Sequence, residues 1–128
     1  MLGYKLAIVG ATGLVGQEFI KILEQRSFPM ESIRLLASDR SAGQKLFVSH
    51  QEILVEETVP ESINDIDIAL FSAGTDISRY FSPIANRSGA VVVDNSSAFR
   101  MDPRVPLVVP EINPEDIRQH KGIIANPN

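Results

Sequence analysis

A short apolar run that stops at a glycine-rich turn constrains the fold of this chain more than any other feature of its sequence. The run extends from Tyr4 to Val9, and an amphipathic segment begins directly after the turn. On a helix, the apolar residues of that segment share one face, and they are Val15, Phe19, Ile22 and Leu23. This order predicts a strand, a tight loop and a helix at the start of the chain.

The turn itself has the spacing G-x-x-G-x-x-G. Gly10 and Gly13 let the backbone turn sharply and approach a ligand, and Gly16 removes a side chain where helix and strand must pack. The first helical turn presents free N–H groups and the positive end of the helix dipole, which together attract a pyrophosphate. The pattern favours a dinucleotide site, and an ordinary glycine turn is the alternative.

Strands and helices alternate along the rest of the chain. The predicted strands cover residues 33–37, 66–71, 90–94 and 123–125, with shorter extended pieces at 46–48, 53–55 and 107–109. The pieces around His50 are expected to pair as a hairpin, with that histidine exposed at the turn. Thr75 or Asp76 is expected to cap a helix that Pro83 kinks or splits near residues 80–82, and a short helix is expected at 114–119.

This alternation predicts the fold class. With 128 residues, of which 44% are hydrophobic, the chain is expected to form one domain, residues 1–128, with a buried core. Strands that alternate with helices call for an α/β fold, namely a Rossmann-type, doubly wound, mostly parallel sheet with helices on both faces. In such sheets the ligand lies at the carboxyl ends of the strands.

Charge and residue usage argue against several kinds of partner. Lys and Arg number 12 against 16 Asp and Glu, and the basic residues are scattered, so no nucleic acid partner is expected. No apolar run approaches the length of a spanning helix and no signal pattern opens the chain, so a cytoplasmic protein without membrane contact is expected. The chain has no cysteine, and His50 and His120 are far apart in sequence, so neither a disulfide nor a metal site is expected.

The loop after the second predicted strand offers two kinds of cofactor contact. Ser38, Arg40 and Ser41 provide one charge-assisted contact and two hydroxyls for a 2′-phosphate. Asp39 could instead hold the ribose hydroxyls of a cofactor without that phosphate, and it must point away if Arg40 binds the phosphate. A solvated turn with an internal pair of Asp39 and Arg40 is the third interpretation.

A second candidate is Arg100, in the polar loop that leaves the strand predicted at 90–94. Its planar guanidinium can capture a phosphate or a carboxylate with two hydrogen bonds. A structural ion pair with Asp102 or Asp94 is the alternative, and the local sequence does not decide between them.

Several stretches, in this order, resemble aspartate-β-semialdehyde dehydrogenase, an enzyme family of the bacterial aspartate pathway. These stretches are Gly10-Ala-Thr-Gly-Leu-Val-Gly16, Ala37-Ser-Asp-Arg-Ser-Ala-Gly43, Phe71-Ser-Ala-Gly74, Val93-Asp-Asn-Ser-Ser-Ala-Phe-Arg100, Val109-Pro-Glu-Ile-Asn113 and Asn126-Pro-Asn128. The resemblance runs the whole length of the chain, and the last three stretches are its specific part.

The resemblance implies a reversible, NADP-dependent reaction in which aspartyl phosphate accepts a hydride and loses phosphate to give the semialdehyde. It assigns the adenosine phosphate to Arg40 and Ser41, the pyrophosphate to residues 12–15, and the substrate phosphate to Arg100 with Asn126 nearby. The predicted cofactor-binding residues are Gly10, Thr12, Gly13, Leu14, Val15, Ser38, Arg40, Ser41, Ser72, Ala73 and Gly74.

One departure from the family is as informative as the match. In the family, the residue after Asn-Pro-Asn is the cysteine nucleophile, whereas this sequence ends at Asn128. The family's general-acid/base histidine and its substrate-gripping residues lie in a second domain, and His50 and His120 match neither role. The chain is therefore expected to be the cofactor domain of an enzyme of lysine, threonine and methionine biosynthesis that works as a homodimer. It is expected to bind NADP without catalysing the reaction.

Three other protein classes compete with this interpretation of the sequence. A short-chain dehydrogenase needs Tyr-x-x-x-Lys, but isoleucines stand four residues after Tyr4 and Tyr80, so that class is excluded. N-acetyl-glutamyl-phosphate reductase uses similar chemistry, yet residues 95–97 and 109–113 favour the aspartyl enzyme. A nucleotide-sensing module without catalysis is the remaining alternative.

Overall fold

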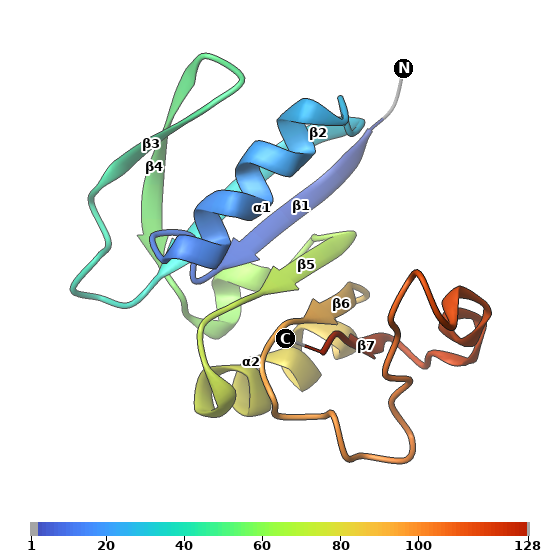
Figure 1. Cartoon of the computed structure of the whole chain (residues 1–128). Coiled ribbons are helices and arrows are strands. Elements are labelled where there is room, and N and C mark those ends of the chain that lie inside the picture. The colour runs from blue at the N-terminus through green and yellow to red at the C-terminus, as the bar shows by residue number, and fades with distance from the viewer. Residues whose placement is uncertain (1–2, 128) are drawn as a thin grey trace.

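The strand that precedes the glycine turn, β1 (Tyr4–Val9), lies inside a seven-stranded sheet in the computed structural model, which describes residues 3–127 (Figure 1). The order of the strands across the sheet is β3-β4-β2-β1-β5-β6-β7. The other strands are β2 (Met30–Ala37), β3 (Lys45–Val48), β4 (Gln51–Glu57), β5 (Ile68–Phe71), β6 (Val91–Asp94) and β7 (Ile123–Ala125). The helical elements are α1 (Leu14–Gln25), η1 (Pro60–Ile63), α2 (Thr75–Arg87) and η2 (Pro114–Gln119).

The sheet winds in two directions from β1. The chain passes from β1 to β2 on one side and later continues through β5, β6 and β7 on the other side, with every one of these neighbours paired in parallel. The pair of β3 and β4 is antiparallel, while β4 also pairs in parallel with β2. The predicted α/β, doubly wound and mostly parallel fold is therefore confirmed.

The helix α1 covers the face formed by β1, β2 and β4 (Figure 1). Ile20 is buried there among residues that include Ile8 and Leu35, and Phe19 and Leu23 pack half-buried against the same cluster. The predicted apolar face was too wide, because Val15 and Ile22 are 41% and 45% exposed. The buried residues of α1 are instead Gly16 and Ile20, and Gly16 lies directly against the backbone of Gly10 and Ala11 in the turn.

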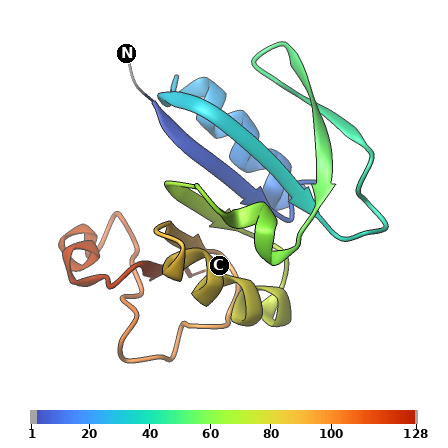
Figure 2. The same cartoon turned by 180° about the vertical axis from the view of Figure 1, so that it is seen from behind.

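The opposite face of the sheet is covered by α2 and η1, as the view from behind shows (Figure 2). Phe81 and Ala85 of α2 pack with Ala69, Phe71 and Val92 in one buried cluster. Helices thus lie on both faces, because alternate residues of each strand point in opposite directions and both sets are apolar.

Pro83 was predicted to kink or split its helix, and the split is not observed. α2 is one helix from Thr75 to Arg87 with Pro83 inside it, although the proline nitrogen has no hydrogen to donate. The burial of Phe81 and Ala85 on either side of the proline favours a continuous helix over a break. Neither Thr75 nor Asp76 caps the helix, since the N-cap is Gly74 with a φ of 94° and no side-chain cap hydrogen bond is formed.

The hairpin prediction was confirmed, with longer strands than expected. β3 and β4 are joined by Ser49 and His50, whose φ values of 50° and 68° are those of a two-residue hairpin turn with both central residues left-handed. His50 is exposed at this turn. The β2 strand also begins earlier than predicted, at Met30.

Residues 107–109 were expected to be extended and do not form a strand. Leu107 makes an isolated parallel bridge with Ala125, and the N–H of Val108 donates to the carbonyl of Ala125 at 3.0 Å. Pro106 and Pro110 flank the segment and cannot donate hydrogen bonds, which keeps the ladder from growing. The short helix at 114–119 is present as the 3-10 helix η2.

One part of the sheet has no helix over it within residues 3–127. On the face that carries α1, a groove of about 780 Å³ runs over β5, β6 and β7, with η2 at its rim. Its apolar lining includes Tyr4, Ile68, Val91 and Val93. The two halves of this face therefore differ in how much of their apolar surface is covered.

The described helices are short. α1 and α2 contain 12 and 13 residues, and no helix in residues 3–127 is long and apolar enough to cross a membrane. The His, Asp and Glu side chains of the same residues do not gather anywhere in a group of three that could hold a metal ion.

The packing of α1 on the turn predicts a sharp difference between two glycines. A Cβ at Gly16 would collide with the carbonyl oxygen of Gly10 and lie 2.9 Å from the Cα of Ala11, both of which are backbone atoms. Gly16→Ala is therefore expected to lower the free energy of unfolding by roughly 1–3 kcal/mol, as overpacking does elsewhere. The measurement is urea denaturation followed by circular dichroism.

Gly13→Ala is the matched control. A Cβ there meets only the Gly10 oxygen at 3.5 Å, and the φ of −76° accepts any residue. Gly13→Ala is therefore expected to change the free energy of unfolding by less than about 1 kcal/mol. Equal stabilities of the two variants would show that α1 does not sit on the turn in this way.

Candidate functional site

The glycine turn brings the start of α1 to the carboxyl end of β1. The N–H groups of Gly10 and Ala11 donate to the carbonyl of Leu36 at 2.8 and 3.1 Å, which ties the turn to the end of β2. Gly10 has a φ of 92°, and a Cβ there would lie 2.7 Å from the carbonyl oxygen of Ser72. No side chain caps α1, so the N–H groups of its first turn have no intrahelical partner and are open to an anion.

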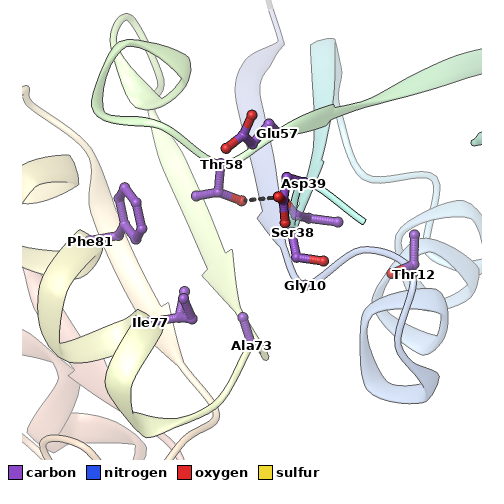
Figure 3. Close-up of a pocket in the computed structure, with 10 residues that line it drawn as sticks. Gly10, Thr12, Ser38, Asp39, Glu57, Thr58, Ala73, Ile77 and Phe81 are labelled. Carbon is purple, nitrogen blue, oxygen red and sulfur yellow. Dashed lines mark hydrogen bonds between the residues drawn. The ribbon is translucent and has the colours of Figure 1, made fainter. Parts of the chain in front are cut away.

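A cavity of about 320 Å³ lies beside this turn, at the carboxyl end of β1, where the winding direction of the sheet changes (Figure 3). It is bounded by the carboxyl ends of β1, β2, β4 and β5 and by one side of α2. The lining residues are Gly10, Thr12, Ala37, Ser38, Asp39, Glu57, Thr58, Ala73, Ile77 and Phe81. Its size is within the range of small-molecule sites, and its place at the switch in winding direction is where doubly wound sheets bind ligands.

The residues at this edge fit a dinucleotide. The hydroxyl of Ser72 is buried without a hydrogen-bond partner among the described residues, directly after β5 and beside the glycine turn. A buried hydroxyl without a partner is costly, and a polar ligand group would satisfy it. Ile77 and Phe81 add an apolar wall that can take a flat base, opposite the polar wall formed by Ser38 and Asp39 (Figure 3).

The structure places the predicted cofactor residues in two groups. Four of them line the cavity itself, namely Gly10, Thr12, Ser38 and Ala73. The others lie around it, with Gly13, Leu14 and Val15 exposed at the start of α1, Ser72 and Gly74 around Ala73, and Arg40 and Ser41 further along the loop after β2. The carboxyl ends of the strands thus gather residues from Gly10 to Gly74, which are 64 positions apart in sequence.

The loop after β2 differs from one detail of the prediction. Asp39 lines the cavity, although it was expected to point away if Arg40 binds a phosphate. Arg40 is exposed, and within residues 3–127 it forms no ion pair with Asp39. The internal pair that was the third interpretation of this loop is therefore not formed.

Sequence reasoning missed the contribution of β4 and α2 to this cavity. Thr58 follows β4, and both its N–H and its hydroxyl donate to the carbonyl of Ala37, at 2.8 and 3.1 Å (Figure 3). The other lining residues that were not predicted are Ala37, Glu57, Ile77 and Phe81. The signal that would have found Thr58 is the parallel pairing of β4 with β2, because that pairing puts the end of β4 at the ligand edge.

The second candidate, Arg100, makes no ion pair within the described residues. The two carboxylates offered as partners are engaged elsewhere: Asp102 pairs with Arg104 at 2.9 Å, and Asp94 accepts from the N–H and hydroxyl of Ser96 at 3.0 and 2.8 Å. Arg100 instead donates to two main-chain carbonyls, from Nε to Asn126 at 3.1 Å and from Nη2 to Asn95 at 2.9 Å.

This geometry brings Arg100 and Asn126 together, 26 residues apart in sequence. The half-buried guanidinium has no carboxylate beside it, so its charge is available to an anion. The nucleophile expected after Asn128 lies outside the described residues, as does Asn128 itself.

The site combines a glycine turn, an uncapped helix start and a cavity at the strand where the winding direction of the sheet changes. These features define a dinucleotide-binding domain of the doubly wound class. The comparison with known protein families identifies the family to which this domain belongs. The chain belongs to the family described as "Semialdehyde dehydrogenase, NAD binding domain", whose model matches residues 5–120.

Several proteins to which this chain is similar are named aspartate-semialdehyde dehydrogenases. Aspartate-semialdehyde dehydrogenase of Bacillus subtilis is 54% identical over 126 residues, which is 98% of this chain and 36% of that protein. Among solved structures, aspartate semialdehyde dehydrogenase II of Vibrio cholerae, complexed with ASA, has a TM-score of 0.90 and 43% identity over 98% of this chain and 42% of that one. The Candida albicans enzyme with NADP has a TM-score of 0.80 and 31% identity over 98% and 42%. The chain thus spans little more than a third of the curated relatives it matches.

The pairing in the loop after β6 predicts which arginine controls Asp102. Arg104 holds the pKa of Asp102 below its ordinary value, first through its side-chain hydrogen bond and then through its backbone N–H. Arg104→Ala is therefore expected to raise the pKa of Asp102 towards its ordinary value, and Arg100→Ala is expected to leave it low. Titration of the carboxyl carbon by NMR measures both.

The sign of the effect on stability follows from the lowered pKa. The ion pair stabilises the fold at pH values above the ordinary pKa of an aspartate, and this stabilisation is lost as the pH falls through the lower, folded-state pKa. The stabilities of the native chain and Arg104→Ala should therefore differ near neutral pH and converge in acid. A rise of the Asp102 pKa in Arg100→Ala would instead assign this carboxylate to Arg100.

Proposed function

We propose that this chain is the NADP-binding domain of an aspartate-semialdehyde dehydrogenase that interconverts aspartyl phosphate and aspartate semialdehyde. The observation that carries the proposal is the cavity at the glycine turn, which lies beside the uncapped start of α1. The first turn of α1 would hold the pyrophosphate, and the cavity would hold the adenosine half. Bound NADPH supplies the hydride for the reduction.

The preference for NADP over NAD is assigned to Arg40, with help from the hydroxyls of Ser38 and Ser41. Support comes from the absence of an ion pair to Arg40 in the described residues, which leaves its guanidinium available to a 2′-phosphate. Asp39 works in the opposite direction, because its carboxylate lines the cavity and repels a phosphate. The preference is therefore the balance between these two neighbours.

The substrate phosphate is assigned to Arg100, with Asn126 beside it. Support comes from the lack of a carboxylate partner for this half-buried guanidinium, since a cation in that position is best satisfied by an anionic ligand. The intact enzyme is proposed to act as a homodimer in the cytoplasm, with the substrate's amino-acid part held by residues of a further domain.

The cofactor assignment predicts a selective effect of Arg40→Ala. The affinity for NADPH is expected to fall by roughly ten- to a hundredfold, the effect of one charge-assisted hydrogen bond, while the affinity for NADH changes little. Asp39→Asn is expected to raise the NADPH affinity, because it removes a negative charge from the cavity wall. Titration of both cofactors, followed by fluorescence, provides the measurement.

Arg26→Ala is the matched control for charge. Arg26 is exposed at the C-terminal end of α1, away from the glycine turn, so its loss changes the net charge equally without touching the site. A native chain that binds NADH as tightly as NADPH, or a preference that survives Arg40→Ala, would contradict the role given to Arg40.

The 128-residue chain is expected to bind the cofactor without turnover. The proposed chemistry needs a thiolate that attacks the acyl phosphate, and the sequence contains no cysteine. Ser96 and Ser97 do not replace it, because a serine hydroxyl is far less acidic than a thiol, and both hydroxyls are engaged, that of Ser96 with Asp94 and that of Ser97 with Thr75. Absorbance of NADPH in the presence of aspartyl phosphate tests this, and steady oxidation above the level of host contaminants would refute it.

A further inference from the structure

Arg100 forms hydrogen bonds with one edge of its guanidinium, and these bonds link the ends of two strands. Nε and one proton of Nη2 point to the same side of the planar group. In this structure they donate to the carbonyls of Asn126 and Asn95, the first residues after β7 and β6. The other edge, formed by Nη1 and the second Nη2 proton, makes no hydrogen bond within residues 3–127.

A chain of short-range hydrogen bonds shapes the loop that returns Arg100 to these strand ends. The carboxylate of Asp94 is fully buried and accepts from the N–H and the hydroxyl of Ser96. The Ser96 oxygen in turn accepts from the N–H of Ala98 at 3.1 Å, and the N–H of Arg100 donates to the carbonyl of Ser97. These bonds fold residues 94–100 into a compact turn, so the position of the guanidinium is set before any ligand arrives.

The segment that leaves β7 has few restraints besides Arg100. The N–H of Asn126 donates to the carbonyl of Asp94 at 2.9 Å, which continues the pairing of β6 and β7 by one residue. Pro127 has no N–H and cannot add another bond. The carbonyl of Asn126 is held by Arg100, so this arginine fixes the orientation of the peptide that joins Asn126 to Pro127.

We propose that Arg100 is a positioning residue for the Asn126–Pro127 segment that leaves β7, acting with the edge formed by Nε and Nη2, while its outer edge stays open for the substrate phosphate. The proposal deepens the proposed function and rests on it for the identity of the anion. The two roles do not compete, because they use different N–H groups of one planar cation. A phosphate on the outer edge is thereby placed at a fixed distance from the segment that leaves β7.

Only an arginine can fill both roles from this position. Its rigid fork reaches two carbonyls at once and still presents two donors on the other side. A lysine keeps the charge but offers a single ammonium group, which cannot span the carbonyls of Asn95 and Asn126 in the same way. Arg100→Lys therefore separates the charge of this residue from its geometry.

The test is amide hydrogen exchange by NMR on the isotope-labelled 128-residue chain without ligand. In Arg100→Ala and Arg100→Lys, the Asn126 amide should exchange roughly tenfold faster than in the native chain, as the loss of one hydrogen bond to a charged group permits. The Val92 amide, which donates to the carbonyl of Gly122 in the same pair of strands, should keep its rate. Arg104→Ala, an exposed arginine of the same loop, is the control and should change neither amide.

A second readout needs no variant. In the native chain, the Nε proton of Arg100 should exchange at least about tenfold more slowly than that of the exposed Arg40, because only the former is held by a carbonyl. Equal rates for these two protons would overturn the proposal. An unchanged Asn126 amide in Arg100→Lys, or equal acceleration of Asn126 and Val92, would overturn it as well.

The same samples keep this proposal apart from the proposed function. NADPH and inorganic phosphate are titrated into the native chain and into Arg100→Lys after the exchange measurement. Faster exchange at Asn126 together with no binding of NADPH supports the positioning role and counts against the proposed function. Normal NADPH binding together with unchanged exchange at Asn126 supports the proposed function and contradicts the positioning role.

Discussion

The close approach of α1 to the carbonyl of Gly10 is the contact on which the rest of the structure depends. A helix that carried a side chain at position 16 would have to move away from β1, because the atoms in its path belong to the backbone. The turn would then lose its place beside the end of β2, to which Gly10 and Ala11 are bonded. The place of the turn at the ligand edge and the packing of the first helix therefore depend on the same backbone contact.

The ligand edge is one connected piece of backbone. The carbonyl of Phe71, at the end of β5, accepts the N–H of Asn95 at 2.9 Å, and the hydroxyls of Thr75 and Ser97 meet at 2.9 Å. These bonds link the start of α2, which borders the cofactor cavity, to the loop that carries Arg100. The two proposed binding regions are therefore held in register by the sheet and by one hydroxyl pair.

Local pattern was enough to predict what depends on neighbouring residues, and it failed where distant segments decide. The strand, turn and helix at the start, the parallel sheet and the hairpin around His50 all follow from periodicity and turn chemistry. The pairing of β4 with β2, and with it the place of Thr58, depends on contacts that no local window contains. Pro83 stays inside a helix because burial on both sides outweighs its own preference. The partners of Arg100 were undecided locally, since only the fold shows that Asp94 and Asp102 are already engaged.

The uneven covering of the sheet has a consequence for the thermodynamics of this domain. The groove over β5, β6 and β7 leaves part of an apolar face in contact with water in the folded state, so unfolding exposes less new apolar surface there. The heat-capacity change of unfolding and the denaturant m-value both scale with newly exposed surface. Both quantities are therefore smaller for residues 3–127 than for a domain of the same length whose sheet is covered on both faces. The free energy of unfolding of residues 3–127 accordingly varies less steeply with temperature.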